Sequence, residues 1–318
     1  MVPDTWTIKE LLNVTSDYLT KKKIDSPRLT AEILLAHQLN RTRIKLYLNF
    51  DLPLSDREVS GYRDLIRRRV DREPLQYITG RQEFWSMDFI VGPHVLVPRP
   101  ESELLVEQVS MIFRGQPSPG TGRPHILDLG TGSGALAVSI ARELEGATLW
   151  ATDISEEALV FARLNAKNHG VADRIDFRLG DLWEPFMDED LTFDGIVSNP
   201  PYVASEAFDT LPPEVRDHEP RVALDGGEGG LHYIEKIIRT GSDYLNPDGW
   251  LLLEMDSAQT EKALSLMDET GGYDVKRRIK DHSHRYRIVM AQNSVACKKK
   301  RGAKKERQMT GTEKAPVL

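Results

Sequence analysis

The sequence predicts an α/β protein in which a small helical domain precedes an open, mostly parallel β-sheet. From residue 125 onward, short apolar runs typical of buried strands alternate with helical patterns, the arrangement that produces parallel sheets. One strand leads into a glycine-rich turn that opens a helix, and another ends in Asn199-Pro200-Pro201-Tyr202. Since open α/β sheets bind ligands at the carboxyl ends of their strands, both features point to one edge of the sheet.

Residues 1–75 predict a bundle of helices. Thr7-Ile8-Lys9-Glu10 and Ser55-Asp56-Arg57-Glu58 both have the capping-box pattern of a helix start, and apolar residues follow each at helical spacing. No residue pattern in this region is typical of catalysis. The basic run Arg67-Arg68-Arg69 favours a solvated helix face, with docking of a partner as the alternative.

Residues 76–98 predict a β-hairpin that links the two domains. Alternating side chains with glycine, proline and aromatic residues replace the helical spacing. The segment leads into Pro98-Arg99-Pro100-Glu101-Ser102-Glu103, where acidic residues in a first turn indicate a helix start. Because Arg99 is held between two prolines, this stretch predicts a rigid edge that leads into a pocket.

Residues 126–129 predict a buried strand, and Gly130-Thr131-Gly132-Ser133-Gly134 follows it as a turn before the next helix. Glycines at these positions let a ligand approach the backbone closely. A second strand, 148–152, ends at Asp153, about 20 positions past the glycines, where a carboxylate can accept both hydroxyls of a ribose. The arrangement favours a nucleotide-type cofactor over a purely structural glycine turn.

The glycine spacing favours S-adenosylmethionine (SAM) over a nicotinamide dinucleotide. Dinucleotide sites have Gly-x-Gly-x-x-Gly, whereas this loop has Gly-x-Gly-x-Gly. SAM has no phosphates, so its site does not need a helix N-terminus aimed at pyrophosphate. Asp128 and the loop carbonyls can face its positive sulfonium. After a third strand, 174–179, comes Gly180-Asp181-Leu182-Trp183, in which the carboxylate can accept from the adenine amine and either following residue can cover the ring; an ordinary loop carboxylate is the alternative.

Asn199-Pro200-Pro201-Tyr202 predicts a substrate pocket. It follows the apolar run 193–198, a predicted buried strand. Two consecutive prolines fix two φ angles and remove two N–H donors. This leaves the Asn199 side-chain oxygen and the carbonyls of Asn199 and Pro200 as acceptors beside an aromatic ring. Such a pocket suits a planar group that carries NH2, namely a side-chain amide, adenine or cytosine. The alternative is an ordinary strand-ending turn.

The remaining chain predicts a lid and three more strands. Residues 203–230 form a long insertion rich in proline, acidic residues and glycine, and we expect it to cover the substrate. His218 lies in this insertion, and a lone loop histidine is not by itself a sign of catalysis. Further predicted strands at 250–254, 274–279 and 285–291 bring the strands of the sheet to seven.

Composition and charge limit the classes of protein to consider. With 318 residues, 40% hydrophobic and 29% charged, the sequence predicts a globular protein of about two domains. It contains no long apolar run, no secretory signal pattern and a single cysteine, so we expect a cytoplasmic protein. Residues 294–318 carry eight basic and two acidic side chains and predict a disordered basic tail. Residues 1–293 therefore have a net charge of −13, which disfavours nucleic-acid binding over a broad face.

The chain resembles the protein-glutamine N5-methyltransferases that modify peptide release factors, the PrmC/HemK family, over about residues 5–292. The glycine-rich loop is typical of SAM methyltransferases in general, and the Asn-Pro-Pro-Tyr tetrapeptide adds methylation of a planar amine. The Pro-Arg-Pro-Glu segment together with the helical domain narrows the likeness to this family. The motifs are Pro98-Arg99-Pro100-Glu101-Ser102-Glu103, Asp128-Leu129-Gly130-Thr131-Gly132-Ser133-Gly134, Asn199-Pro200-Pro201-Tyr202, Glu219-Pro220-Arg221 with Ala223-Leu224-Asp225-Gly226-Gly227, and Leu251-Leu252-Leu253-Glu254. Two features depart from the family pattern: Asp256, where glycine is common, and the basic tail.

The resemblance implies a fold, a reaction and a site. It implies a seven-stranded Rossmann-like class I methyltransferase sheet over 99–293, with the last strand antiparallel, behind a helical bundle (1–75) that would dock the substrate and a hairpin linker (76–98). It implies SAM as cofactor and, as substrate, the glutamine of the Gly-Gly-Gln loop in class I peptide chain release factors, with no metal, membrane or direct nucleic-acid substrate. The implied catalytic residues are Asn199, Pro200 and Tyr202. The implied cofactor residues are Gly130, Thr131, Gly132, Ser133, Gly134, Asp153, Asp181, Leu182 and Asn199, and the implied substrate residues are Asn199, Pro200, Pro201, Tyr202, Arg99 and Glu101.

Three alternatives share much of this pattern. A related family methylates a glutamine of a ribosomal protein, although it usually lacks the Pro-Arg-Pro form. Adenine-N6 methyltransferases of DNA and RNA share the acceptor pocket, but they need a basic cleft for a flipped base, which the acidic body disfavours. A binding module that keeps the fold without activity is disfavoured by the intact tetrapeptide and glycine loop.

Overall fold

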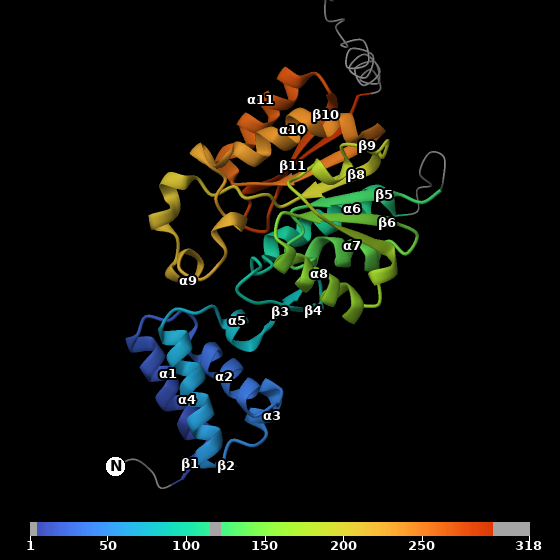
Figure 1. Cartoon of the computed structure of the whole chain (residues 1–318). Coiled ribbons are helices and arrows are strands. Elements are labelled where there is room, and N and C mark those ends of the chain that lie inside the picture. Colours follow the sequence, from blue (N-terminus) through green and yellow to red (C-terminus); the bar gives the residue numbers. More distant parts are fainter. Residues whose placement is uncertain (1–4, 115–121, 295–318) are drawn as a thin grey trace, which may run out of the picture. The chain divides into compact units, whose positions relative to one another are not determined.

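The computed structural model describes residues 5–114 and 122–294 (Figure 1). The chain divides into two compact units. The helical unit consists of Met1–Gln82, Val91–Pro93 and Leu211–Glu219, and the sheet unit of Glu83–Ile90, His94–Thr210 and Pro220–Leu318. These units differ from the predicted domain boundaries, since most of the hairpin counts with the sheet unit and residues 211–219 count with the helical unit. The predicted basic tail lies outside the described residues from residue 295 onward.

In the helical unit, two long helices begin where the sequence predicts. The Thr7 and Ser55 side chains each accept from the backbone N–H three residues on, and Glu10 and Glu58 return a bond to the cap, so both predicted capping boxes are confirmed. The unit contains β1 (Trp6–Thr7), α1 (Ile8–Lys21), α2 (Pro27–Gln38), α3 (Arg43–Tyr47), β2 (Pro53–Leu54), α4 (Asp56–Val70), α5 (Leu75–Thr79) and, from the later segment, α9 (Pro213–Arg216). Its fully buried side chains include Ile8, Leu12, Leu34, Leu35, Leu46 and Tyr62.

Helix α5 occupies residues where the sequence predicted the start of the hairpin. Pro74 precedes it with extended angles, φ −53° and ψ 137°, and Gly80 at φ 72° ends it after five residues. A helix this short does not show the 3.6-residue period on which such predictions depend. The hairpin itself follows as β3 (Arg81–Phe84) and β4 (Met87–Ile90), which pair in a two-stranded sheet.

The sheet unit contains the predicted seven-stranded sheet. Its strands run in the order β10-β11-β9-β8-β5-β6-β7 (Figure 1). The last strand, β11, is antiparallel to both of its neighbours, and the pairs from β9 to β7 are parallel, so the predicted topology is confirmed. The strands are β5 (His125–Leu129), β6 (Thr148–Asp153), β7 (Ile175–Leu179), β8 (Phe193–Ser198), β9 (Leu245–Glu254), β10 (Tyr273–Lys280) and β11 (Tyr286–Asn293). The longer helices are α6 (Glu103–Phe113), α7 (Ala135–Glu143), α8 (Glu156–Asn168), α10 (His232–Tyr244) and α11 (Thr260–Thr270).

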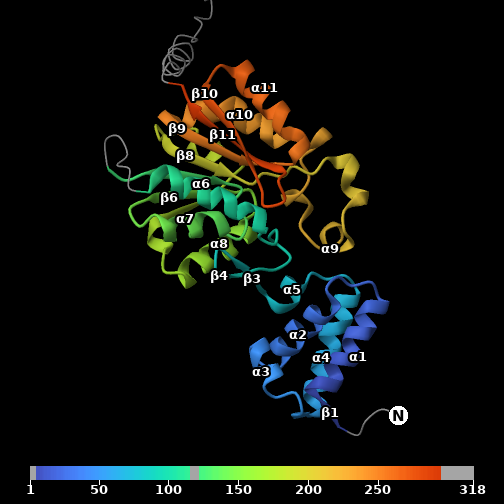
Figure 2. The same ribbon diagram turned by 180° about the vertical axis from the view of Figure 1, so that it is seen from behind.

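Helices cover both faces of this sheet, and strand residues alternate between two cores (Figures 1 and 2). Ile126 of β5 and Val197 of β8 pack with residues of α6 and α7. Leu127 and Ile196, one position away in the same strands, pack with residues of α10 and α11. Because both faces are buried at β5 and β8, these central strands are mostly apolar, and the sequence shows them as apolar runs.

The register of the parallel strands brings four turns to one edge of the sheet. Leu129 of β5 pairs with both Thr152 of β6 and Ser198 of β8, and Ser198 pairs in turn with Leu253 of β9. The residues that follow these positions are Gly130, Asp153, Asn199 and Glu254. They therefore leave the sheet next to one another at its carboxyl edge, where such sheets bind ligands.

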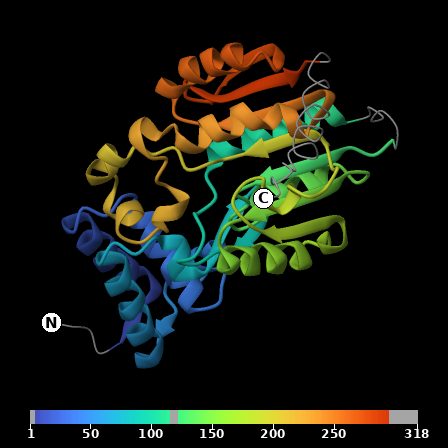
Figure 3. The same cartoon turned by 45° about the horizontal axis from the view of Figure 1, so that its top comes forward.

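The connection from β8 to α10, drawn in yellow to light orange in Figure 3, carries several short helices. Besides α9, they are η4 (Ser205–Thr210), η5 (Arg221–Ala223) and η6 (Glu228–Gly230). Residues 211–219 belong to the helical unit, and the rest of the connection belongs to the sheet unit. The segment predicted as a lid is thus a folded connection divided between the two units.

Candidate functional site

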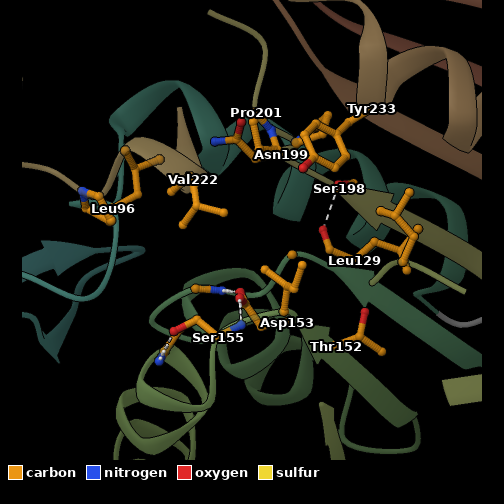
Figure 4. Close-up of a pocket in the computed structure, with 18 of the residues that line it drawn as sticks. Leu96, Leu129, Thr152, Asp153, Ser155, Ser198, Asn199, Pro201, Val222 and Tyr233 are labelled. Atoms are coloured by element: carbon orange, nitrogen blue, oxygen red, sulfur yellow. Dashed lines mark hydrogen bonds between the residues drawn. The ribbon is translucent and has the colours of Figure 1, made fainter. Parts of the chain in front are cut away.

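Two adjoining pockets open at the carboxyl edge of the sheet, both within the sheet unit. They share Leu96, Gly130, Gly132 and Asn199. Other residues of the first pocket, many of them drawn in Figure 4, include Asp153, Ile154, Ser155, Asp181, Leu182, Pro200, Pro201, Val222 and Tyr233. Other residues of the second pocket include Pro98, Arg99, Ser102, Thr131 and Ser133. The structure therefore brings the predicted glycine loop and the predicted tetrapeptide to one site, with Asn199 at the junction.

The glycines of the loop have two different roles. Gly130 and Gly132 have φ values of 73° and 56°, and no other heavy atom lies within 4 Å of the position a Cβ would take at either. This open space faces the pockets. Gly134, at φ 80° before α7, instead packs against α8, where an added Cβ would lie 3.0 Å from Ala162 Cα. It lines neither pocket.

The Asp153 carboxylate connects the end of β6 to the glycine loop. Its Oδ2 accepts from the Gly132 N–H (2.8 Å) and its Oδ1 from the Ser155 N–H (3.0 Å). Burial raises the pKa of Asp153, and these backbone donors oppose the rise. Each carboxylate oxygen has a second lone pair, so Asp153 can still accept from two hydroxyls of a guest. Figure 4 shows Asp153 and Ser155 across the pocket from Asn199 and Tyr233.

Asp128 supports the loop from the protein interior and lines neither pocket. It has no exposed surface, and its Oδ2 accepts from Thr131 Oγ1 (2.7 Å) and the Ala137 N–H (3.2 Å). Complete burial raises the pKa of Asp128 to about 7, although these two bonds favour the ionised form. The expectation that it faces the ligand is therefore replaced by a role in holding the loop.

The turn after β7 places Leu182, and not Trp183, in the first pocket. Gly180 and Leu182 have φ values of 157° and 48°, and Leu182 lines the first pocket together with Asp181. Trp183 instead turns inward, is 9% exposed and stacks on Tyr244 with ring centroids 4.6 Å apart. Leu182 is thus the residue placed to contact a ring in the pocket, and Trp183 belongs to the core.

The tetrapeptide follows β8, every residue of which is buried. Ser198 Oγ donates to the Leu129 carbonyl (2.7 Å) and links the ends of β8 and β5. Asn199, Pro200 and Pro201 all line the first pocket, as predicted from the acceptor pattern. Tyr202 lines neither pocket, because its ring packs beside the core that contains α10 and α11 and its hydroxyl turns toward β9.

The sequence alone did not single out Ser102 and Glu254 as site residues. The Glu254 carboxylate accepts from Ser102 Oγ (2.6 Å) and Tyr202 Oη (3.3 Å), and Asn199 Nδ2 donates to Ser102 Oγ (2.9 Å). Burial raises the pKa of Glu254 to about 7 and also raises the pKa of Tyr202. The only signal for this cluster in the sequence is that Ser102 and Glu254 lie inside two of the motifs.

The other predicted substrate residues differ in position. Arg99 lines the second pocket, beside Ser102 and Asn199. Glu101 is exposed in the short helix η1 (Pro100–Ser102) and lines neither pocket. Its negative charge lies close enough to contribute to the raised pKa of Glu254, after the larger effect of burial.

The departure at Asp256 has a structural role. Asp256 has ordinary extended angles, φ −66° and ψ 147°, so this turn does not require glycine. Its side chain and backbone form a capping box with Ala258 and Gln259, and Met255 is fully buried. The substitution is therefore compatible with an intact site.

The pockets fit SAM by their chemistry. The loop offers uncovered backbone at Gly130 and Gly132 for a close-lying zwitterionic group, Asp153 offers acceptors for ribose hydroxyls, and Leu182 offers an apolar contact for a base. A sulfonium needs no metal. Within residues 5–114 and 122–294, no group of three or more His, Cys, Asp or Glu could hold a metal ion, and no helix is long and apolar enough to cross a membrane.

Comparison with known proteins identifies the family. Two family models match the chain: the PrmC N-terminal domain over residues 10–80 and the methyltransferase small domain over residues 101–212. Among solved structures, the hMettl16 catalytic domain in complex with MAT2A 3′UTR hairpin 6 has a TM-score of 0.52 at 16% identity and covers 70% of this chain and 81% of that chain. At this identity the likeness concerns the fold alone.

Two curated relatives are similar over nearly their full length. The chain is 42% identical over 272 residues to the release factor glutamine methyltransferase of Geobacter sulfurreducens, covering 86% of this chain and 92% of the relative. It is 39% identical over 289 residues to that of Rhodopirellula baltica, covering 91% and 97%. The chain therefore belongs to the family of release factor glutamine methyltransferases and is an enzyme that uses SAM as its methyl donor.

Proposed function

We propose that this enzyme methylates the side-chain amide nitrogen, N5, of the glutamine in the Gly-Gly-Gln loop of class I peptide chain release factors. The observation that carries the proposal is the position of Asn199 at the junction of two pockets, with Pro200 and Pro201 beside it. The names of the relatives, which specify a glutamine and a release factor, support the substrate class.

The acceptors of the tetrapeptide suit the difficulty of this reaction. A carboxamide nitrogen is a poor nucleophile because its lone pair is delocalised into the carbonyl. Acceptance of its two N–H bonds by Asn199 Oδ1 and the Pro200 carbonyl would fix the nitrogen in the junction and favour positive charge building on it. SAM supplies the methyl group from a sulfonium. The tetrapeptide contains no histidine or lysine that could act as a general base, so the proton of the methylated nitrogen would leave after methyl transfer, to water or to another acceptor.

The first pocket would hold the nucleoside part of SAM. Asp153 would accept from the ribose hydroxyls, and Asp181 and Leu182 would contact the adenine. The backbone from Gly130 to Ser133 would lie against the methionine part, with Thr131 and Ser133 on the side of the second pocket, whereas Gly134 packs against α8. This division leaves Asn199 between the methyl donor and the incoming amide.

The helical unit would dock the release factor. It contains no catalytic pattern, and it exposes large apolar side chains at both ends of α3, where Ile44 in the first turn is 73% and Leu48 after the last turn is 77% exposed. Arg99, in the wall of the second pocket, would contact the substrate backbone near the glutamine. The negative charge of residues 1–293 argues that the release factor, and not a nucleic acid, is the direct substrate, and a role in translation argues for the cytoplasm.

The test is mass spectrometry of a purified class I release factor after incubation with the enzyme and SAM. We expect the mass of one added methyl group, confined to the tryptic peptide that contains Gly-Gly-Gln. A release factor with Gly-Gly-Gln→Gly-Gly-Ala is the matched substrate control and should gain nothing. The variant Asn199→Ala should lose activity and retain SAM binding.

The alternatives predict different results. Tritium from labelled SAM that appears in RNA or DNA, and not in the release factor, would point to adenine methylation. Methylation of a ribosomal protein with no change in the release factor would point to the related glutamine methyltransferases. Asn199→Ala at the wild-type rate would overturn the assigned role of the acceptor pocket.

A further inference from the structure

A chain of hydrogen bonds connects the Asn199 side chain to a buried carboxylate. Asn199 Nδ2 donates to Ser102 Oγ (2.9 Å), and Ser102 Oγ donates to Glu254 Oε2 (2.6 Å). Asn199 is half-buried and lines both pockets, whereas Ser102 is 4% and Glu254 1% exposed. The chain thus runs from the pocket junction into the interior of the sheet unit.

The fold brings these three residues together from distant parts of the sequence. Ser198 of β8 pairs with Leu253 of β9, so Asn199 and Glu254 are the next residues on adjacent parallel strands. Leu253 belongs to the core with α10 and α11, and alternation along a strand turns Glu254 to the opposite face, where α6 packs. Ser102 immediately precedes α6. It therefore lies where a hydroxyl can join the two strand ends.

The direction of each bond follows from the groups involved. An ionised carboxylate only accepts, so the single O–H of Ser102 must point to Glu254. The distance of 2.6 Å is in the range of hydrogen bonds from a hydroxyl to a carboxylate. The Ser102 oxygen can then only accept a hydrogen bond from Asn199, so Asn199 must turn its donor, Nδ2, toward Ser102. Oδ1 is the side-chain atom of Asn199 that remains for a guest.

We propose that Ser102 and Glu254 are positioning residues for methyl transfer: the Glu254 carboxylate, acting through the Ser102 hydroxyl, fixes the Asn199 amide with Oδ1 toward the substrate. The inference rests on the proposed function, in which Asn199 Oδ1 accepts from the glutamine amide. Without this control, a rotated amide would present Nδ2, a donor, to the N–H bonds of the substrate, and the two donors would repel each other.

Protonation of Glu254 would reverse the direction of the hydrogen bonds between Glu254, Ser102 and Asn199. A carboxylic acid can donate to Ser102 Oγ, which frees the hydroxyl proton to donate to Asn199 Oδ1 and turns Nδ2 to the pocket. Burial raises the pKa of Glu254 to about 7, so this change falls in an accessible pH range. The charged and titratable groups that act on Glu254 are Tyr202 of the tetrapeptide, Glu101 of η1 and Arg287 of β11.

The first test is a set of kinetic measurements on the full-length enzyme with a class I release factor and SAM. We expect Ser102→Ala and Glu254→Gln each to lower kcat about 10- to 100-fold, the loss typical of a misplaced catalytic group, with SAM affinity unchanged. Because both residues act through one chain, the double variant should lose no more than the larger single loss. Ser110→Ala is the matched control, since Ser110 is a buried serine of α6, the helix that Ser102 precedes, and its Oγ has no partner within the described residues.

The pH profile separates this role from a general structural one. The wild-type kcat should fall below about pH 7, roughly tenfold for each pH unit, as Glu254 takes up its proton. Glu254→Gln should remove this limb, because its amide does not titrate. A wild-type kcat in Ser102→Ala, or the same acid limb in Glu254→Gln as in the wild type, would overturn the proposal.

A second measurement follows the hydrogen-bond chain directly, in the absence of substrate. In protein labelled with 15N-asparagine, the side-chain NH2 signals of Asn199, assigned by their loss in Asn199→Ala, should shift with an apparent pKa near 7. The shift should be absent in Glu254→Gln and in Ser102→Ala and preserved in Ser110→Ala. If the wild type left every release factor unmodified, the proposed function would fail. The titration would still test the hydrogen-bond chain independently, because Asn199 signals that do not respond to pH would overturn it.

Discussion

Gln259, in the turn before α11, donates from Nε2 to the Tyr202 carbonyl over 2.9 Å and holds the end of the tetrapeptide. The same nitrogen lies 3.0 Å from the Gly229 carbonyl and 3.1 Å from the Gly230 carbonyl. The Asp256 N–H donates to Gln259 Oε1 (3.0 Å), which orients the amide so that its nitrogen faces the three carbonyls. One buried side chain thus joins the tetrapeptide, the glycines of η6 and the start of α11.

Removal of this amide should loosen the site. We expect Gln259→Leu to lower the free energy of unfolding by about 1–3 kcal/mol, because carbonyls buried in the fold lose their donor. It should also lower kcat more than it lowers SAM affinity, since Tyr202 is adjacent to the acceptor pocket. Chemical denaturation and calorimetry measure the two effects. The matched control is Gln292→Leu, which removes a single exposed bond to the Asp248 carbonyl and should cost less. Equal losses in the two variants would contradict the assigned role.

Asp153→Asn should weaken SAM binding. The two carboxylate oxygens accept from different backbone N–H groups, so an amide must present its NH2 to one of these donors and also loses an acceptor for ribose. We expect the dissociation constant for SAM to rise about 10- to 100-fold, the cost of lost hydrogen bonds to a charged group. Isothermal titration calorimetry measures it. Asp173→Asn, an exposed charge-matched change, should leave SAM affinity unaltered. Equal affinities in both variants would remove Asp153 from the cofactor site.

Features with a local pattern could be predicted from the sequence. The glycine loop, the Asp153 position and the apolar strand before Asn199 are each encoded within a few residues, and the parallel topology then places them at one edge. The central strands β5 and β8 are buried on nearly every side chain and show apolar runs, so they could be predicted locally. The antiparallel last strand is instead an implication of the family resemblance, since no local pattern gives the direction of a strand.

The features that escaped prediction depend on contacts between distant residues. Ser102 and Glu254 are 152 positions apart, and their bond requires the register of β8 against β9 and the placement of α6. The inward turn of Trp183 depends on stacking with Tyr244, which lies far along the sequence at the end of α10. No window of sequence contains either relationship, so periodicity and motif spacing could not reveal them.

Glu254→Gln should raise stability at neutral and alkaline pH although it lowers activity. Burial raises the pKa of Glu254 to about 7 from its ordinary value of 4.5, so the folded protein binds this proton more tightly than the unfolded chain does. The contribution of Glu254 to the free energy of unfolding is therefore greatest below pH 4.5. It decreases as the pH rises to about 7, by on the order of 3 kcal/mol for such a shift.

The measurement is the difference in free energy of unfolding between the variant and the wild type, determined by denaturation from pH 5 to pH 8. The advantage of Glu254→Gln should increase with pH and level off above pH 7. Glu189→Gln, which changes an exposed carboxylate, serves as the control and should show no such gain. A difference between Glu254→Gln and the wild type that stays constant across this range would show that Glu254 does not titrate as described.

Glu214→Gln should release residues 211–219 from the rest of the helical unit. Glu214 Oε1 accepts from Arg69 (2.8 Å) and Arg72 (3.2 Å), and Arg69 is 6% exposed. Although burial opposes ionisation, a hydrogen bond from the backbone of Glu214 and the bonds from these two arginines hold the pKa of Glu214 below its ordinary value. The ion pairs therefore stabilise the fold above pH 4.5, and their contribution is lost as the pH falls through the lowered pKa.

We expect the variant to lose about 1–3 kcal/mol at pH 7, since bonds to a charged group are removed and Arg69 is left buried without its counterion. Hydrogen exchange should rise first in residues 211–219, because Glu214 bonds this segment to Arg69 of α4 and to Arg72 just after it. Asp209→Asn, an exposed change in the adjoining helix η4, is the control and should leave exchange unchanged. The deficit relative to wild type should shrink below pH 4.5. Faster exchange spread evenly over the whole helical unit would instead show that the ion pairs act on the bundle and not on the segment.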